Sequence, residues 1–540
     1  MNSFQAIDWI VVGMYFSIIL GIAWWVIRKK QESPADYFLA GRHVGWFVIG
    51  ASIFASNIGS EHIVGLAGTA AKSGVVMGHY ELHSWLVLLL GWVFVPFYMR
   101  SKVFTMPEFL EKRYSPELRW FLSLITLIGY VLTKVSVTVY AGAVVFQTLM
   151  GIDFWTGALI VVILTGIYTV LGGLRAVMYT ETLQTFVLIA GSVAVTVIGL
   201  IKIGGWDNLV AIVGIDHLNL FLPADHPDFP WTGMIFAPPI VGLWYWCTDQ
   251  YIVQRTLAAK NETQARRGTI FASYLKLLPF FIFIIPGVIA FALSKTGHFQ
   301  LLEADQAFPT LVKTLLPTGL RGLVTGGLLA ALMSSLAAVF NSCSTLFTMD
   351  IYKKLKPDSS EKTLVLVGRI ATGVVVVSGV LWIPFMKYIS GELYHYLQSV
   401  QAYIAPPIAA VFLLGLFFKR INAKGALAAL VGGFVLGMSR LVTELIKHEL
   451  GGWLYTFANM NFLHFCIFLF LVCIVVMIVV SLLTPAPNFE QIKGLTYATT
   501  VGADKARSRA SWNTRDVVLS VIIIVILALV LMYFSPLFLS

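Results

Sequence analysis

The sequence predicts an all-α polytopic membrane protein, and composition is the first of three observations behind that prediction. The 540 residues are 58% hydrophobic and only 12% charged, with a mean hydropathy of +0.83. So little charge cannot cover the surface of a soluble protein of this length. The second observation is a series of apolar runs, each close to the roughly 20 residues that cross a bilayer. The third is the placement of basic residues in alternate loops between those runs.

The apolar runs predict about fourteen transmembrane helices, because each is bounded by polar or charged residues and is long enough for one crossing. They lie near residues 9–27, 45–71, 77–99, 118–149, 154–174, 177–203, 231–255, 268–294, 319–352, 364–386, 390–417, 423–446, 461–483 and 516–537.

Charge sets the expected orientation. The formal net charge is +10, and the Lys and Arg residues gather in alternate loops, whereas the loops at 206–230 and 449–461 carry almost none. By the positive-inside rule the basic loops are cytoplasmic. We therefore expect a multi-pass protein of the plasma (inner) membrane with both termini extracellular or periplasmic. The excess charge is explained by these loops, so no nucleic-acid partner is expected, and the lipid bilayer is the partner that composition implies.

The order of spans predicts an internal repeat. Two blocks of five spans cover residues 45–203 and 231–417, and because five is odd, consecutive copies have opposite membrane topology. The other segments are a first transmembrane helix with a cytoplasmic loop (1–44), an extracellular loop (204–230), peripheral helices (418–483), a cytoplasmic linker (484–514) and a last transmembrane helix (515–540).

The leading span of each block is interrupted by polar residues. Residues 54–62 (FASNIGSEH) place an amide, hydroxyls, a carboxylate and an imidazole around Gly59, and the second block has Pro238-Pro239 followed by residues 244–250 (WYWCTDQ). Unpaired polar groups are costly in hydrocarbon, and two interrupted spans at corresponding positions indicate a substrate site at mid-membrane. A kinked helix whose polar groups satisfy one another is the alternative for the first stretch.

Polar and aromatic residues in five spans supply the chemistry that a sugar needs, namely directional hydrogen-bonding groups and flat apolar faces. A structural Glu81–Lys276 ion pair, and ordinary packing of the Trp and Tyr residues, remain open as alternatives. The candidates are Asn57, His62, Tyr80, Glu81, His83, Ser84, Trp244, Tyr245, Trp246, Asp249, Lys276, Tyr394, Gln398 and Gln401.

An ion site is predicted where the ninth span faces the first interruption. The adjacent hydroxyls of Ser334 and Ser335, the carbonyl of Ala331, and the carbonyls of Ala55 and Ile58 make about five neutral oxygen ligands. A neutral oxygen set fits sodium better than a divalent cation, which prefers carboxylates. Alternatively, the two serines bond only to the preceding turn of their own helix.

Three long motifs carry a resemblance to a known family: residues 55–60 (ASNIGS), 244–250 (WYWCTDQ) and 344–352 (STLFTMDIY). Over nearly its whole length the chain resembles the sodium/glucose cotransporter branch of the sodium:solute symporter family. The resemblance implies a LeuT-type inverted five-helix repeat with additional helices. It also implies a transporter rather than an enzyme, with sodium as the coupling ion and no other cofactor.

The resemblance also implies a role for each matching residue. The implied sodium ligands are Ala55, Ile58, Ala331, Ser334 and Ser335. The implied sugar contacts are Asn57, His62, Glu81, Trp246, Lys276 and Gln398, and further substrate-binding candidates are Ser84 and Gln401. The implied inner gate is Tyr245, and the implied outer gate is Tyr80 with Tyr394.

Departures from the family pattern refine these expectations. Family members that move two sodium ions resemble one another in an Asp and two hydroxyl-bearing residues. This chain has Glu181, Ala337 and Ala338 in those places, so we expect one sodium per sugar. Gly242 replaces an Asn or Thr that relatives use for sugar, and Gln401 replaces a Thr found in some of them.

The expected function is therefore sodium-coupled symport of a glucose- or galactose-like hexose. Residues 60–62 (SEH) resemble the myo-inositol branch, which keeps a polyol substrate open. A sugar-gated sensor or channel on the same scaffold is a further alternative, and proton coupling through Glu181, Glu61 or His62 is another. A membrane enzyme is disfavoured, since no motif supports a metal site or a nucleophile–base pair. The natural sugar, the affinity and the oligomeric state do not follow from the sequence.

Overall fold

The computed structural model describes residues 4–28, 33–59, 61–386 and 393–538, without the side chains of 27, 132, 167, 168, 170–173 and 382–386. Within these ranges the chain is helical throughout its regular structure, and the backbone pairing of Val44 with Ala259 is an isolated bridge. The prediction of an all-α protein is confirmed. Ser60, in the polar stretch of the first interruption, lies outside the described residues, as does the start of the predicted span at 390–417.

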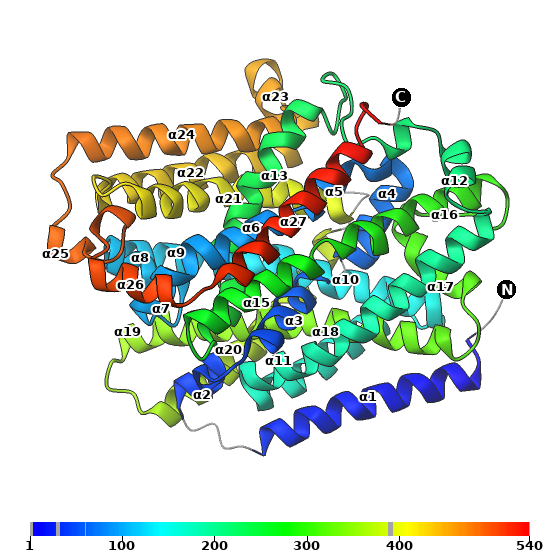
Figure 1. Ribbon diagram of the computed structural model, residues 1–540, viewed down its shortest axis with the longest axis horizontal. Coiled ribbons are helices and arrows are strands. Elements are labelled where there is room, and N and C mark those ends of the chain that lie inside the picture. The colour runs from blue at the N-terminus through cyan, green and yellow to red at the C-terminus, as the bar shows by residue number, and fades with distance from the viewer. Residues whose placement is uncertain (1–3, 29–32, 60, 387–392, 539–540) are drawn as a thin grey trace.

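The helices run in both directions through one elongated bundle (Figure 1). Those of the first half are α1 (Ala6–Ile27), α2 (Pro34–Leu39), α3 (Trp46–Asn57), α4 (Ala67–Ser73), α5 (Gly78–Glu81), α6 (Ser84–Leu89), α7 (Val95–Ser101), α8 (Met106–Arg113), α9 (Pro116–Tyr130), α10 (Ser136–Val145), α11 (Phe154–Ile203) and α12 (Trp206–Val213). Those of the second half are α13 (Trp231–Cys247), α14 (Gln250–Leu257), α15 (Glu262–Leu275), α16 (Ile285–Lys295), α17 (Ala307–Leu315), α18 (Leu320–Leu346), α19 (Lys353–Leu355), α20 (Glu361–Met386), α21 (Leu393–Phe417), α22 (Ala423–Leu445), α23 (Gly452–Ala458), α24 (Phe462–Leu483), α25 (Phe489–Ile492), α26 (Gly502–Ala510) and α27 (Thr514–Tyr533).

Fewer helices in the described ranges meet the length and hydropathy requirement for crossing a bilayer than the sequence predicts. Eleven helices in the described ranges are long and apolar enough to cross a bilayer, and the helices Trp46–Asn57 and Phe154–Gly166 are apolar but shorter. The predicted count of about fourteen is therefore not confirmed. The differences arise where predicted spans are broken, as after Asn57 and Cys247, and where the spans at 154–174 and 177–203 fall within the single helix α11.

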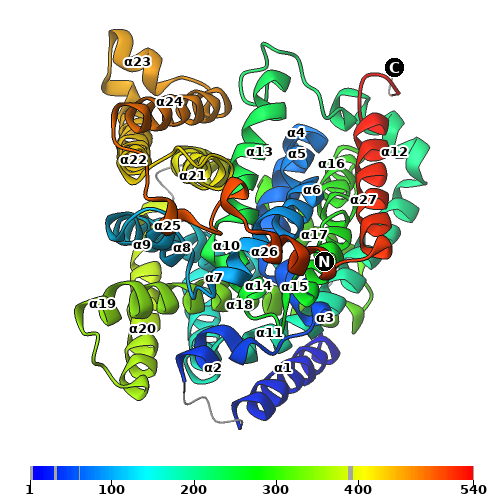
Figure 2. The same ribbon diagram turned by 60° about the vertical axis from the view of Figure 1, so that its left-hand side comes forward.

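Burial separates a central helix from a lipid-facing rim. In α18, 94% of the most apolar window is buried, against 28% in α1, α24 and α27. The exposed faces of these three helices are apolar, which suits contact with lipid. In both views α21, α22 and α24 lie together on one side of the bundle (Figures 1 and 2). In Figure 1, α1 starts and α27 ends toward the right-hand end of the bundle.

Both predicted interruptions are present. Helix α3 ends at Asn57, Ile58 has an extended backbone (φ −78°, ψ 90°), and the chain resumes as a π-helix at Glu61–Leu66. Helix α13, which contains Pro238 and Pro239, ends at Cys247, and α14 begins after Asp249. Because α14 packs on α3, the two breaks lie near each other inside the bundle.

Candidate functional site

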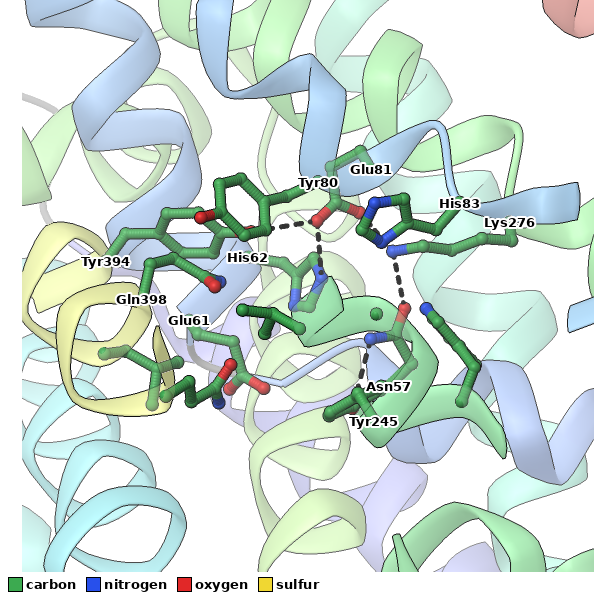
Figure 3. A pocket seen from close by; sticks show the side chains of 15 residues that line it. Asn57, Glu61, His62, Tyr80, Glu81, His83, Tyr245, Lys276, Tyr394 and Gln398 are labelled. Atoms are coloured by element: carbon green, nitrogen blue, oxygen red, sulfur yellow. Dashed lines mark hydrogen bonds and ion pairs between the residues drawn. The ribbon is translucent and has the colours of Figure 1, made fainter. Parts of the chain in front are cut away.

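Glu81 is the centre of a buried cluster of charged and polar side chains (Figure 3). Its Oε2 accepts a hydrogen bond from Lys276 Nζ at 2.5 Å, while its Oε1 lies 3.2 Å from His62 Nε2 and accepts the Tyr394 hydroxyl at 3.1 Å. Glu81, Lys276 and His62 are each no more than 3% exposed. A buried charge inside a membrane protein persists only when it is paired, and these contacts supply the pairing.

Asn57 joins this cluster to the first helix interruption. It is the last residue of α3, and its Oδ1 accepts a hydrogen bond from Lys276 Nζ at 2.9 Å. Its Nδ2 donates to the Tyr245 hydroxyl at 3.2 Å, which connects the cluster to α13. The Lys276 ammonium also lies 5.2 Å from the centre of the Trp246 ring. The break in α3 thus exposes an amide that contacts two other elements.

The cluster surrounds a contracted pocket. The open space is about 40 Å³, which is room for a few water molecules, whereas pockets that hold drug-sized ligands measure about 300–1,000 Å³. A substrate therefore enters by replacing contacts among the lining residues. Those residues are Asn57, Glu61, His62, Tyr80, Glu81, His83, Val241, Gly242, Tyr245, Trp246, Lys276, Tyr394, Leu397, Gln398 and Gln401.

Several polar atoms in the pocket wall are available to a ligand. Within the described part of the chain, no hydrogen-bond partner is found for His62 Nδ1, the Tyr80 hydroxyl, His83 Nε2 or Gln398 Oε1, and all four are buried. A buried polar group without a partner costs about 1–3 kcal/mol. The rings of Tyr80 and Tyr394 lie edge to face, 6.4 Å apart, at the pocket wall.

The structure brings together ten of the eleven residues that the sequence predicts for substrate binding and gating. Ser84 is the exception, since it is buried at the start of α6 and does not line the pocket. His83, which the sequence indicates as a candidate without a specific role, also lines the pocket. Glu61 is a lining residue that the sequence does not place among the sugar candidates, and its position next to the predicted His62 is the signal that could have found it.

Two of the predicted ion ligands, Ser335 and Ile58, face each other where α18 passes the first interruption. The Ser335 hydroxyl lies 3.3 Å from the carbonyl oxygens of both Ser56 and Ile58. The Ser334 hydroxyl is fully buried and has no partner among the described residues. Ala55 lies in the last turn of α3, and Ala331 lies one turn before Ser335 on α18. The predicted ligands are hydroxyl and carbonyl oxygens, and such a set fits a small monovalent cation.

Comparison with known proteins identifies the family. The family model described as "Sodium:solute symporter family" matches residues 37–433. The chain belongs to this family. Sodium/glucose cotransporter 1 from Oryctolagus cuniculus is 40% identical to this symporter over 529 residues, which cover 90% of this chain and 80% of the relative. Sodium/myo-inositol cotransporter 2 from the same organism is 38% identical over 537 residues, covering 92% and 80%. These relatives are transporters and not enzymes.

A solved structure shows the same fold. A Na⁺-coupled sialic acid symporter in a substrate-bound, outward-open state superposes with a TM-score of 0.76 at 22% identity, and the match covers 90% of this chain and all of that chain. This confirms the transporter fold expected from the resemblance.

The symporter carries a second buried ion pair below Tyr245, which the sequence alone does not predict. Lys134 Nζ lies 2.5 Å from Asp249 Oδ2, and the Tyr130 hydroxyl donates to the other oxygen of the same carboxylate. The Lys134 ammonium also lies 3.9 Å from the centre of the Tyr251 ring and 4.5 Å from that of Tyr245. Aromatic faces stabilise such a cation, so this cluster packs against Tyr245, which the family resemblance implies as the inner gate.

A third buried pair occupies the place that the family resemblance connects with a second sodium ion. Glu181 Oε1 lies 3.0 Å from Arg255 Nη2, and both side chains are fully buried. The same carboxylate accepts hydrogen bonds from the hydroxyls of Ser52 and Ser56. Glu181 is therefore already paired with a guanidinium cation and two hydroxyl donors.

Proposed function

We propose that this symporter carries a hexose sugar, glucose- or galactose-like, together with sodium by alternating access. The observation that carries the proposal is the continuity of the two sites along one interrupted helix. Asn57 is in the substrate pocket, and the carbonyl of the next residue, Ile58, faces Ser335 on α18. Sodium bound between these elements holds the break against α18, and this orders Asn57 for the substrate.

The pocket chemistry supports a polyhydroxylated, uncharged substrate. Glu81 and Lys276 balance each other's charge, so an ionic substrate gains no unpaired counter-charge from this pair. On binding, sugar hydroxyls replace the contacts of Lys276 with Glu81 and Asn57, and the Trp246 face packs against the C–H groups of the ring. Gln398 and Gln401 in the same wall supply further donors and acceptors.

The gating residues lie on either side of this pocket in the proposed cycle. Tyr80 and Tyr394 close the outer side, and Tyr245, anchored by Asn57, closes the inner side.

We further propose the LeuT-type inverted repeat, about fourteen crossings and external termini. The shared end of α1 and α27 supports termini on one side of the membrane, and the basic residues in alternate loops support that side being external. The accessibility of single cysteines next to each terminus to an impermeant thiol reagent tests it.

One sodium ion per sugar is the proposed stoichiometry. Arg255 already neutralises Glu181, and Ala337 and Ala338 offer no hydroxyl on α18. With one charge moved, each 100 mV contributes about 2.3 kcal/mol to accumulation. The reversal potential of sugar-coupled current, measured while the sodium and sugar gradients are varied, gives the ratio. A shift that corresponds to two sodium ions contradicts the proposal.

A polyol such as myo-inositol is the second candidate substrate. Glu61 lines the pocket beside His62, so the acidic residue of the myo-inositol-like motif is at the site. A sodium/myo-inositol cotransporter is also about as similar in sequence as the sodium/glucose cotransporter.

The first experiment is uptake of labelled glucose, galactose and myo-inositol into proteoliposomes under an imposed sodium gradient. We expect sodium-dependent accumulation of one of them in the wild type and its loss in Ser335→Ala. Accumulation that does not depend on sodium contradicts the proposal. Sodium currents evoked by sugar without labelled uptake favour a sugar-gated sensor or channel instead.

A further inference from the structure

His83 occupies an unusual position in the pocket wall. It follows the end of α5 and precedes α6, where Leu82 leaves the helical conformation (φ −77°, ψ 36°). This break places two successive polar residues of one span, Glu81 and His83, on the same pocket. In Figure 3 the His83 ring lies beside Glu81 and Lys276.

The imidazole of His83 has a buried nitrogen atom without a hydrogen-bond partner in the described part of the chain. His83 is 4% exposed, and its Nε2 has no hydrogen-bond partner among the described residues. By contrast, the neighbouring Glu81, Lys276 and Asn57 are all hydrogen-bonded to one another or to further residues. An unpaired nitrogen in a pocket wall is costly unless a ligand or water pairs with it.

Gly242 on α13 makes room for this ring. A Cβ built on Gly242 would lie 2.8 Å from both Cε1 and Nδ1 of His83 and 2.4 Å from Cδ1 of Leu86. Real Cβ atoms do not approach other atoms so closely, so a side chain at residue 242 and the observed His83 ring exclude each other. The Nδ1 edge of the imidazole faces the space beside Gly242, and Nε2 is enclosed without a hydrogen-bond partner among the described residues.

We propose that His83 is a substrate-specificity residue that acts from the space left by Gly242. Its Nε2 hydrogen-bonds one hydroxyl of the transported sugar or polyol, in the place that a side chain at residue 242 would otherwise fill. A neutral imidazole nitrogen either donates or accepts, depending on the tautomer, and a hydroxyl complements both. The inference rests on the proposed function and adds the residue pair that selects among hydroxyl arrangements.

A panel of monodeoxy analogues of the transported substrate tests this inference in proteoliposomes. In the wild type, we expect removal of one particular hydroxyl to weaken apparent affinity about 5- to 100-fold, the range for losing one buried hydrogen bond. In His83→Ala that analogue and the parent substrate become nearly equal, while the apparent sodium affinity is unchanged. In Gly242→Ala, which displaces the ring, discrimination falls at the same hydroxyl.

Two further variants separate recognition from packing. His79→Ala is the matched control, because His79 is a second, half-buried imidazole on the same segment. Its Nε2 contacts the Leu220 carbonyl, and it does not line the pocket. The variant should leave the deoxy-sugar profile unchanged. Gly242→Asn alone should lose uptake through the steric clash, and His83→Ala combined with Gly242→Asn should regain uptake with a changed profile.

The outcomes that overturn the inference are distinct from failure of the proposed function. If the wild type accumulates a sugar but His83→Ala and Gly242→Ala both keep its deoxy-sugar profile, His83 is only a packing residue. If Gly242→Ala changes discrimination at a different hydroxyl from His83→Ala, the two residues do not act as a pair. If the wild type accumulates no sugar or polyol under a sodium gradient, the proposed function fails, and this inference fails with it.

Discussion

The two interrupted helices differ in how their exposed groups are satisfied. At the first interruption, after Asn57, the backbone N–H of Ile58 donates to the Phe54 carbonyl at 2.9 Å. On the facing helix α18, however, the Ser334 hydroxyl has no partner among the described residues, and the Ser335 hydroxyl reaches the Ser56 and Ile58 carbonyls only at 3.3 Å. At the second, after Cys247, the backbone N–H of Asp249 donates to the Trp244 carbonyl at 2.9 Å. The Asp249 carboxylate is held by Lys134 and Tyr130.

The difference indicates a division of roles. Irregular backbone inside a membrane protein persists only where protein groups or a ligand satisfy it. The second interruption is satisfied by the protein's own charges, so it acts as a fixed structural element beneath Tyr245. The first retains oxygen atoms with capacity for a cation, so its stability depends on what binds there. Variants at the two interruptions should therefore fail in different ways.

The largest expected effect is on stability at the second interruption. Asp249→Asn leaves the Lys134 ammonium buried without its carboxylate, which should lower the free energy of unfolding by about 3–5 kcal/mol. Thermal unfolding of the purified protein in detergent measures the change. Replacing both charges, as Lys134→Met with Asp249→Asn, should recover part of the loss because no unpaired charge remains. An unchanged unfolding temperature in the single variant would show that this pair does not stabilise the break.

A smaller effect, on ion affinity, is expected at the first interruption. Ser335→Ala removes a hydroxyl that faces the Ser56 and Ile58 carbonyls, and a hydrogen bond or ligand contact to a charged species is worth about 1.5–3 kcal/mol. The apparent sodium affinity should fall roughly 10- to 100-fold, by that same range, with little change in unfolding temperature. Sodium titration of substrate uptake measures it.

The control for this variant is Ser344→Ala on the same helix. The Ser344 hydroxyl donates to the Gly368 carbonyl on α20 at 2.7 Å, away from the interruption. It should leave the apparent sodium affinity unchanged. Equal effects of the two variants would argue that Ser335 acts through general packing of α18.

Physical reasoning from the sequence predicts the positions of both interruptions and most of the pocket. Polar residues such as Asn57, Glu81 and Lys276 stand out in apolar runs, and since hydrocarbon offers them no partner, they must meet one another. The sequence does not show which charges pair. Lys134 and Asp249 lie in different spans, and Glu181 pairs with Arg255 although 74 positions separate them. Such pairings depend on how helices pack, which periodicity along the chain does not encode.

The helix count and the role of His83 show the same limit. Counting apolar residues cannot tell one long helix from two short ones, as α11 illustrates. The space that the His83 ring occupies depends on the missing side chain of Gly242 on another helix, a relation visible only in three dimensions. Sequence reasoning also places Ser84 with its neighbours Tyr80 and Glu81, but the break before α6 leaves it outside the pocket lining.

The smallest expected effect lies where the two interruptions meet, at Tyr245. Tyr245→Phe removes the hydroxyl that accepts the Asn57 amide at 3.2 Å but keeps the ring over Lys134. One neutral hydrogen bond is worth about 0.5–1.5 kcal/mol, so apparent substrate affinity should change roughly 2- to 12-fold, with no loss of thermal stability. Tyr245→Ala also removes the ring, and it should lower the unfolding temperature. If Tyr245→Phe destabilised the protein as strongly as Asp249→Asn, the first interruption would depend on the second, and the proposed division of roles would be wrong.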